Sequence, residues 1–242
     1  MSILLKKRLI ARDQGVFGVV LGERLAGKST LAGTLNGKTI MLTAGLFETG
    51  SGSAQAKAKE LGNHLDVSQF DSITELHEMI AEIADSDYDN VYIDGASGIT
   101  ELLYRSPEIK AALKKNTWDG FRDIADRVED HMLATKSLAS QANKNVFYTM
   151  SVAPEMDKMG NVLQLKPEQK GGATVKNMKA IFPVVISIKS RYDDEGNQMD
   201  APELVTKTNG LHSGRLDDLL SEDNPGVVPA DLSLIVNLLR GE

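Results

Sequence analysis

The sequence contains no cysteine, and no apolar run approaches the ~18 residues of a membrane-spanning helix. Without cysteine, a disulfide framework, a thiolate-ligated metal site and thiol redox chemistry are excluded, and a reducing compartment is favoured. Residues 1–7 place an apolar triplet before two lysines, the reverse of the order in a secretory signal peptide. The four histidines show no metal-ligand spacing, so we expect no structural metal and interpret them as surface or hydrogen-bonded positions. We expect a cytoplasmic protein without a membrane span.

The charge balance is acidic, with a formal net charge of −7. The chain as a whole therefore does not attract nucleic acid, although a local basic stripe can still bind phosphates. Hydrophobic residues make up 41% of the sequence and charged residues 25%, which are ordinary values for a globular protein. We expect one domain over residues 1–242, with its core at about 14–191 and a hairpin and helix over 192–242.

Five short, largely apolar runs predict strands that are buried on both faces of a parallel sheet. They are residues 16–21, 38–43, 90–94, 145–150 and 184–188. Helical patterns over 72–84 and 119–143 lie between them, and Ser72 with Glu75 forms a capping-box pattern at the start of the first. Strands that alternate with helices predict an α/β fold with a mainly parallel central sheet and helices on both faces.

The C-terminal part follows a different pattern. Residues 193–197 are polar and turn-rich, and they separate an apolar run ending at Arg191 from a second run over 199–206. This arrangement predicts an antiparallel β-hairpin at the end of the sheet. Pro229 is expected in the first turn of a terminal helix.

A phosphate-binding motif directly follows the first predicted strand. Gly22, four spacer residues, Gly27, Lys28 and Ser29 match the P-loop pattern, and a helical segment follows. Such a loop turns backbone N–H groups inward toward phosphates, while the lysine neutralises the β and γ phosphates and the hydroxyl binds magnesium. ATP and Mg²⁺ are therefore the expected ligands. The predicted phosphate contacts are Gly22, Glu23, Arg24, Leu25, Ala26, Gly27, Lys28, Ser29 and Thr30.

Polar residues at the ends of other strands complete the predicted site. Asp94 closes the third predicted strand and is the candidate second protein ligand of magnesium, beside Ser29. The next residue is Gly95, so the carboxylate that activates water must come from elsewhere. Glu48, just beyond the second strand, and Glu101 are the two candidates. Thr149 ends the fourth strand and would approach the γ phosphate if that strand lies between those of Gly22 and Asp94.

In this order, the motifs resemble those of RecA-like P-loop ATPases, most closely the phage-encoded, AAA-type nucleotide-binding proteins related to single-strand annealing and recombination ATPases. The similar parts are residues 22–29, 91–94, 119–149 and 190–215, of which the first is highly specific. The resemblance implies that Glu48 activates the attacking water. It also implies a homo-oligomeric ring or filament and a location in the host cytoplasm if the protein is phage-encoded. The spacers of the P-loop are bulkier than is usual in that family, which favours slow turnover.

The resemblance further implies that a basic residue beyond the core strands completes the site of a neighbouring subunit. The candidates are Lys207, Arg215 and Arg191. Single-stranded DNA contacts are expected from the segment 166–179, in which Lys166 and above all Lys170, Lys176 and Lys179 surround Gly171 and Gly172. A second basic cluster over 105–115 precedes Trp118.

Three functions are compatible with these patterns. The first is a magnesium-dependent ATPase that acts on single-stranded DNA in recombination, replication or repair, together with a partner of that machinery. The second is a nucleotide-dependent assembly or scaffold protein with little turnover, which the absence of a carboxylate at position 95 favours. The third, a small-molecule or nucleotide kinase, is less favoured because kinases need arginines that grip both donor and acceptor, and here the arginines are scattered.

Overall fold

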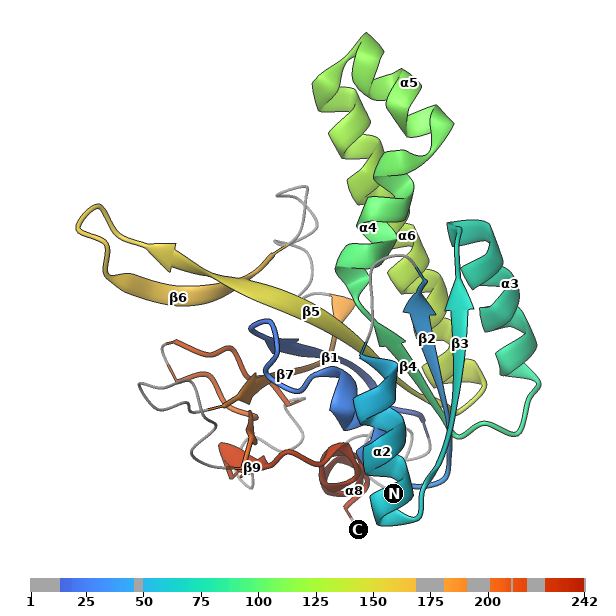
Figure 1. Ribbon diagram of the computed structural model, residues 1–242, viewed down its shortest axis with the longest axis vertical. Coiled ribbons are helices and arrows are strands. Elements are labelled where there is room, and N and C mark those ends of the chain that lie inside the picture. Colours follow the sequence, from blue (N-terminus) through green and yellow to red (C-terminus); the bar gives the residue numbers. More distant parts are fainter. Residues whose placement is uncertain are drawn as a thin grey trace, which may run out of the picture.

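The computed structural model describes residues 14–45, 50–168, 181–190, 201–209, 211–216 and 225–241. Within these ranges the chain has a mixed α/β fold around a mostly parallel central sheet (Figure 1). The strands are β1 (Phe17–Gly22), β2 (Lys38–Ala44), β3 (His64–Phe70), β4 (Asn90–Asp94), β5 (Asn145–Met156), β6 (Val162–Pro167), β7 (Val184–Lys189), β8 (Glu203–Val205) and β9 (Val227–Pro229). The helices are η1 (Ser29–Thr34), α2 (Ser51–Leu61), α3 (Ile73–Ala84), α4 (Ala96–Arg105), α5 (Pro107–Lys115), α6 (Thr117–Gln141) and α8 (Leu232–Arg240).

The strand order places β5 between the strand of the phosphate loop and the strand of Asp94. The order is β3-β2-β4-β5-β1-β7-β8-β9, and β6 pairs with β5 outside this path. Along this order, the six strands β3, β2, β4, β5, β1 and β7 are all paired in parallel. The five strands predicted from apolar runs are among them, so these predictions are confirmed. The predicted antiparallel pairing of the late segment is also confirmed, because β7 pairs with β8 in that sense. The turn expected at 193–197 lies outside the described residues.

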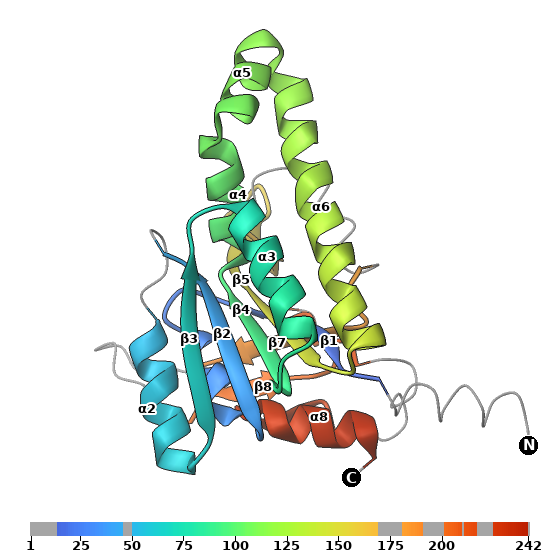
Figure 2. The same cartoon turned by 90° about the vertical axis from the view of Figure 1, so that its right-hand side faces the viewer.

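Successive side chains along the buried strands point to opposite faces and build two separate cores. On one face, Val19 belongs to an apolar cluster with residues of α3, α4 and α6. On the other face, Val20 belongs to a cluster with residues of η1, α2 and α8. Figure 2 shows α3, α4 and α6 on one side of the sheet and α2 on the other, so the expectation of helices on both faces is confirmed.

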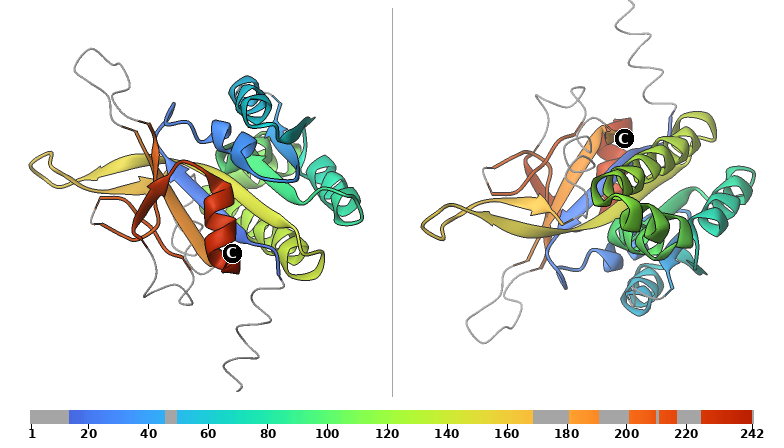
Figure 3. Two further views of the ribbon diagram at one scale, coloured as in Figure 1. Left: turned by 90° about the horizontal axis from the view of Figure 1, so that it is seen from below. Right: turned by 90° about the horizontal axis from the view of Figure 1, so that it is seen from above.

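Two elongated segments project beyond these layers. Helices α4, α5 and α6 form a helical projection above the carboxyl edge of the parallel strands, and β5 with β6 forms a long antiparallel arm (Figures 1 and 3). Both begin beside the same strand ends, because α4 directly follows β4 and the arm continues β5. The residues at that edge are therefore connected to both projections.

Several details differ from the sequence-based expectations. The helical segment after the phosphate loop is a 3₁₀ helix of 6 residues, so its dipole contributes less than that of a full α-helix. Pro229 ends β9, and α8 begins at Leu232 with the Asp231 side chain as its N-cap, so the expected place of Pro229 in a helix is wrong. Strand β3, an edge strand, was not predicted.

At the start of α3, the expected cap is present with one change. The Ser72 hydroxyl accepts the Glu75 N–H at 3.1 Å, but the Glu75 carboxylate accepts the N–H of Asp71 rather than that of Ser72. In the described ranges, no helix has the length and apolar character that crossing a membrane requires.

Candidate functional site

The backbone of the phosphate loop is shaped by two left-handed residues and one crowded glycine. Leu25 has φ 65° and Gly27 has φ 91°, and alternation of hand turns successive N–H groups to one side. The Leu25 side chain is 94% exposed, so the bulk that distinguishes this loop from a glycine-rich one points into solvent. A Cβ on Gly22 would lie 2.4 Å from Cγ2 of Ile188, so only glycine fits between the loop and β7. The two positive φ values are typical of an anion-binding loop, and within the loop the Ala26 N–H donates to the Glu23 carbonyl oxygen at 3.3 Å.

The Lys28 ammonium lies over the beginning of this loop. Its Nζ donates to the carbonyl oxygens of Gly22 at 2.9 Å and Glu23 at 2.7 Å. The Tyr92 hydroxyl, from strand β4, donates to the Lys28 carbonyl oxygen. Burial, and then the nearby Asp94, raises the pKa of Tyr92 well above its ordinary value, so this hydroxyl remains a donor. Tyr92 thus anchors the backbone of Lys28, and two carbonyl oxygens at the start of the loop hold its ammonium group.

Asp94 and Thr149 meet at the carboxyl ends of β4 and β5. The Thr149 hydroxyl donates to Asp94 Oδ1 at 2.7 Å and accepts the Gly95 N–H at 2.7 Å. Asp94 is only 2% exposed, and its other oxygen, Oδ2, has no hydrogen-bond partner among the described residues. A buried carboxylate oxygen without a partner is costly, and a cation is the ligand that satisfies it.

The Ser29 hydroxyl converges on the same point. A Cβ placed on Gly50 would lie 2.3 Å from Ser29 Oγ and 3.5 Å from Asp94 Oδ2. Both oxygens therefore lie within 3.5 Å of one position beside the phosphate loop. A hydroxyl and a carboxylate oxygen are hard ligands, and Mg²⁺ commonly combines one or two such protein ligands with phosphate oxygens and water. The residues present fit a magnesium ion.

Thr43 is a buried neighbour of Asp94 that the sequence did not reveal. It pairs in register with Asp94 across β2 and β4, and it is 1% exposed. Its Oγ1, like Asp94 Oδ2, lacks a hydrogen-bond partner in the part of the chain that the structure describes. A threonine in a strand is ordinary, and only the register of β2 against β4 reveals its position.

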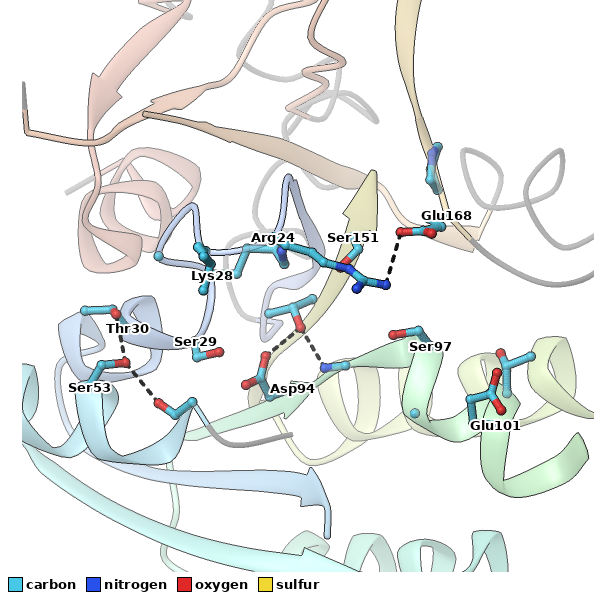
Figure 4. Close-up of a pocket in the computed structure, with 18 residues that line it drawn as sticks. Arg24, Lys28, Ser29, Thr30, Ser53, Asp94, Ser97, Glu101, Ser151 and Glu168 are labelled. Atoms are coloured by element: carbon cyan, nitrogen blue, oxygen red, sulfur yellow. Dashed lines mark hydrogen bonds and ion pairs between the residues drawn. The ribbon is translucent and has the colours of Figure 1, made fainter. Parts of the chain in front are cut away.

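These residues border an open pocket of about 990 Å³ (Figure 4). Lys28, Ser29, Asp94 and Thr149 line it on the side of the sheet. The start of α2 lines the pocket with Gly50 and Ser53. A further wall comes from α4 and the base of the β5–β6 arm, and it carries Ser97, Thr100, Glu101, Ser151, Pro167 and Glu168. The pocket thus opens at the carboxyl edge of the parallel strands, where α/β proteins bind ligands.

Other residues of the predicted phosphate set lie in or beside this pocket. Arg24 reaches across it toward Glu168, with 4.0 Å between Nη2 and Oε2, and both side chains are at least half exposed. Thr30 donates to the Ser53 hydroxyl at 3.0 Å, which ties η1 to α2. Neither Ser53 nor Glu168 was anticipated, because each comes from a segment without a recognisable motif. Glu101, one of the two candidate bases, is half-buried in the wall.

Five predicted site residues lie outside the described residues. These are Glu48, Lys170, Lys176, Lys179 and Arg191. Lys207 and Arg215 are described, and they form an antiparallel backbone bridge with each other beside β7. Both side chains are exposed, and neither lines the pocket of its own chain.

Comparison of the chain with protein-family models finds no match, and comparison with curated proteins finds none either. The function is therefore argued from the geometry of this site.

Proposed function

We propose that the chain is a magnesium-dependent ATPase of the RecA-like P-loop class. One observation carries the proposal. The Lys28 ammonium, the Ser29 hydroxyl and the unpartnered Asp94 Oδ2 gather in and beside one open pocket, next to a loop whose backbone has positive φ at Leu25 and Gly27. A triphosphate with its magnesium ion matches these groups in charge and in ligand chemistry.

The strand order supports the RecA-like assignment. The sequence-based role of Thr149 required its strand to lie between those of Gly22 and Asp94, and β5 occupies this position. Thr149 is hydrogen-bonded to the candidate magnesium ligand and to the Gly95 N–H at the start of α4. A change in charge at the γ phosphate can therefore be transmitted through Thr149 to α4.

The proposed roles follow from position. The loop N–H groups and Lys28 would bind and orient the phosphates, Ser29 and Asp94 would hold magnesium, and Thr43 would support Asp94 from the neighbouring strand. Magnesium, when bound, neutralises charge that develops on the phosphates. Glu48 remains the first candidate for the base that activates water, and Glu101 is the second because it lines the pocket.

We further propose that the protein assembles through its own copies and acts on single-stranded DNA, as a phage recombination or replication ATPase does. The exposure of Lys207 and Arg215, away from the pocket of their own chain, is compatible with a role in a neighbour's site. A cation supplied by a neighbour stabilises transition-state charge, so an isolated monomer should hydrolyse ATP slowly.

A scaffold or switch with little turnover is the second candidate. Gly95 follows Asp94 directly, so the carboxylate that many ATPases carry at this position is absent. The kinase alternative receives less support, because Arg24 is the one arginine that lines the pocket within the described ranges.

ATP hydrolysis at several protein concentrations, with and without single-stranded DNA, tests these functions. An assembling ATPase gives a specific rate that rises with protein concentration and with DNA. Glu48→Gln should abolish ATP turnover and retain ATP binding. If turnover persists in that variant, loss of turnover in Glu101→Gln would identify Glu101 as the base. Tight ATP binding without turnover under every condition would establish the switch in place of the ATPase.

A further inference from the structure

The tip of the helical projection carries a basic and aromatic surface that the nucleotide site does not use. We name the tip surface for its residues Lys110, Lys114, Lys115 and Trp118. All four side chains are exposed. Trp118, the only tryptophan in the sequence, is a large apolar side chain and is nevertheless 84% exposed. None of the three lysines has an ion-pair partner within the described residues.

Packing fixes the two helices that carry the tip surface. Ile109 is fully buried, and a Cβ on Gly120 would lie 2.6 Å from Leu113 Cδ2, so α5 lies tightly against α6. Lys110 and Lys114 each follow one of these inward-facing residues and are four positions apart, so they lie on one side of α5. Asn116 caps α6 by accepting the Trp118 N–H at 3.1 Å, which fixes the start of that helix next to α5. The end of α5 that carries the lysines and the start of α6 that carries Trp118 are therefore packed against each other.

The neighbouring acids do not cancel this charge. Asp119, next to Trp118, accepts a hydrogen bond from the Asn116 amide and pairs with Arg122 at 3.5 Å. Glu108 is the one acidic residue of α5 itself. The tip surface is therefore locally cationic on a chain whose net charge is −7. Cations spaced along a helix suit a row of phosphates, and an exposed indole suits an unpaired base.

We propose that the tip surface binds a single-stranded polynucleotide, with the lysines on its phosphates and a base stacked on Trp118. The inference deepens the proposed function, because it rests on an ATPase that acts on single strands and names the surface that contacts them. Helix α4 connects the two sites, since it begins one residue after Gly95 in the pocket and ends where α5 begins. Its 10 residues span about 15 Å.

Because Trp118 is the only tryptophan, its intrinsic fluorescence reports on this surface alone. Without nucleotide, titration with an oligodeoxythymidine of about 30 residues should quench the emission, because stacking brings the base onto the indole. Oligouridine distinguishes RNA from DNA, and a DNA duplex should quench little because its bases are already stacked. An unchanged emission with both single strands overturns the proposal and leaves an acidic protein surface as the remaining partner.

Substitutions supply a second readout. With a labelled oligonucleotide, Trp118→Ala should weaken binding by about 5- to 100-fold, and Trp118→Phe should recover most of the loss. Lys110→Gln with Lys114→Gln should lower the slope of log affinity against log salt by about 1.4. The matched control replaces Lys59 and Lys158, which are exposed on α2 and at the tip of the β5–β6 arm. An equal change of the salt-dependence slope in the two double variants would contradict a specific role of the tip surface.

Failure of this proposal can be separated from failure of the proposed function. The fluorescence titration needs no ATP, so Lys28→Ala should give the same quenching as the unaltered protein. Quenching without any ATP binding would refute the ATPase and keep the tip surface. ATP hydrolysis without quenching would refute the tip surface and keep the ATPase.

Discussion

Gly50→Ala should disable the magnesium site without altering any predicted ligand. The new Cβ would lie 2.3 Å from Ser29 Oγ and 2.5 Å from Ser29 Cβ, closer than real Cβ contacts ever come. Gly50 has φ −76°, which alanine adopts freely, so the effect is steric rather than conformational. Either Ser29 or the backbone at Gly50 must move by about 1 Å to restore ordinary contact.

A displacement of this size exceeds what a metal site tolerates, because ligand distances are held to within about 0.2 Å. We therefore expect the affinity for ATP in the presence of magnesium to fall by about 10- to 100-fold. In excess EDTA, Gly50→Ala and the unaltered protein should bind ATP equally weakly. The overpacking itself should lower the free energy of unfolding by about 1 to 3 kcal/mol.

Gly52→Ala is the matched control, since no atom of the described residues outside its own helix turn and chain neighbours lies within 4 Å of its Cβ position, and it is in the first turn of α2. This change should leave magnesium-dependent ATP binding intact and stabilise the helix by up to about 1 kcal/mol. Calorimetric titration of both folded variants with ATP, with magnesium and then with EDTA, measures the difference. Equal magnesium-dependent affinity for the two variants would refute the placement of the metal between Ser29 and Asp94.

Three further substitutions test the surroundings of the site and of the core. Asp94→Asn keeps an acceptor for Thr149 but removes a buried charge, so ATP turnover should disappear while the unfolding free energy rises by about 1 kcal/mol; a loss of stability in denaturant titration would contradict this account. Thr149→Val leaves the Gly95 N–H and the Asp94 carboxylate without their partner and should destabilise by about 2 to 4 kcal/mol, whereas Thr149→Ser should not; equal melting temperatures would count against it. Burial, and then the charge of His77, lowers the pKa of His131 from 6.5 to about 3, so His131 is neutral in the folded state and the unfolded state takes up the proton first. Stability should therefore fall as the pH drops from about 6.5 toward 3, and His131→Gln should reduce this slope by up to about 1.4 kcal/mol per pH unit; an unchanged slope would contradict the assignment.

The strands and the phosphate loop were predictable because their signals are local. Apolar runs and the spacing from Gly22 to Ser29 identify them without any long-range contact. Strand β3 was missed because it is a half-exposed edge strand. Its apolar residues Leu65 and Val67 alternate with polar ones, so they form no continuous apolar run. Pro229 was misplaced because proline is tolerated both at the end of an edge strand and in the first turn of a helix.

The assembly of the site depends on register and strand order, which no local pattern encodes. Thr43 lies beside Asp94 only because β2 and β4 pair with these residues opposite each other. The role of Thr149 required β5 to be inserted between β4 and β1, which the sequence left as a condition. Gly50 carried no signal either, since its importance comes from its distance to Ser29 and Asp94.

The most direct test of the central claim is calorimetric titration of ATP with magnesium into the unaltered protein and into Lys28→Ala. Lys28 donates to two carbonyl oxygens of its own loop, each worth about 1 kcal/mol in net stability, so the variant should remain folded. The account predicts magnesium-dependent binding to the unaltered protein and a loss of at least about 10-fold in the variant, because Lys28 would neutralise the phosphates. Binding that is absent in the unaltered protein, or equal in both, would contradict the assignment of this pocket to a nucleoside triphosphate.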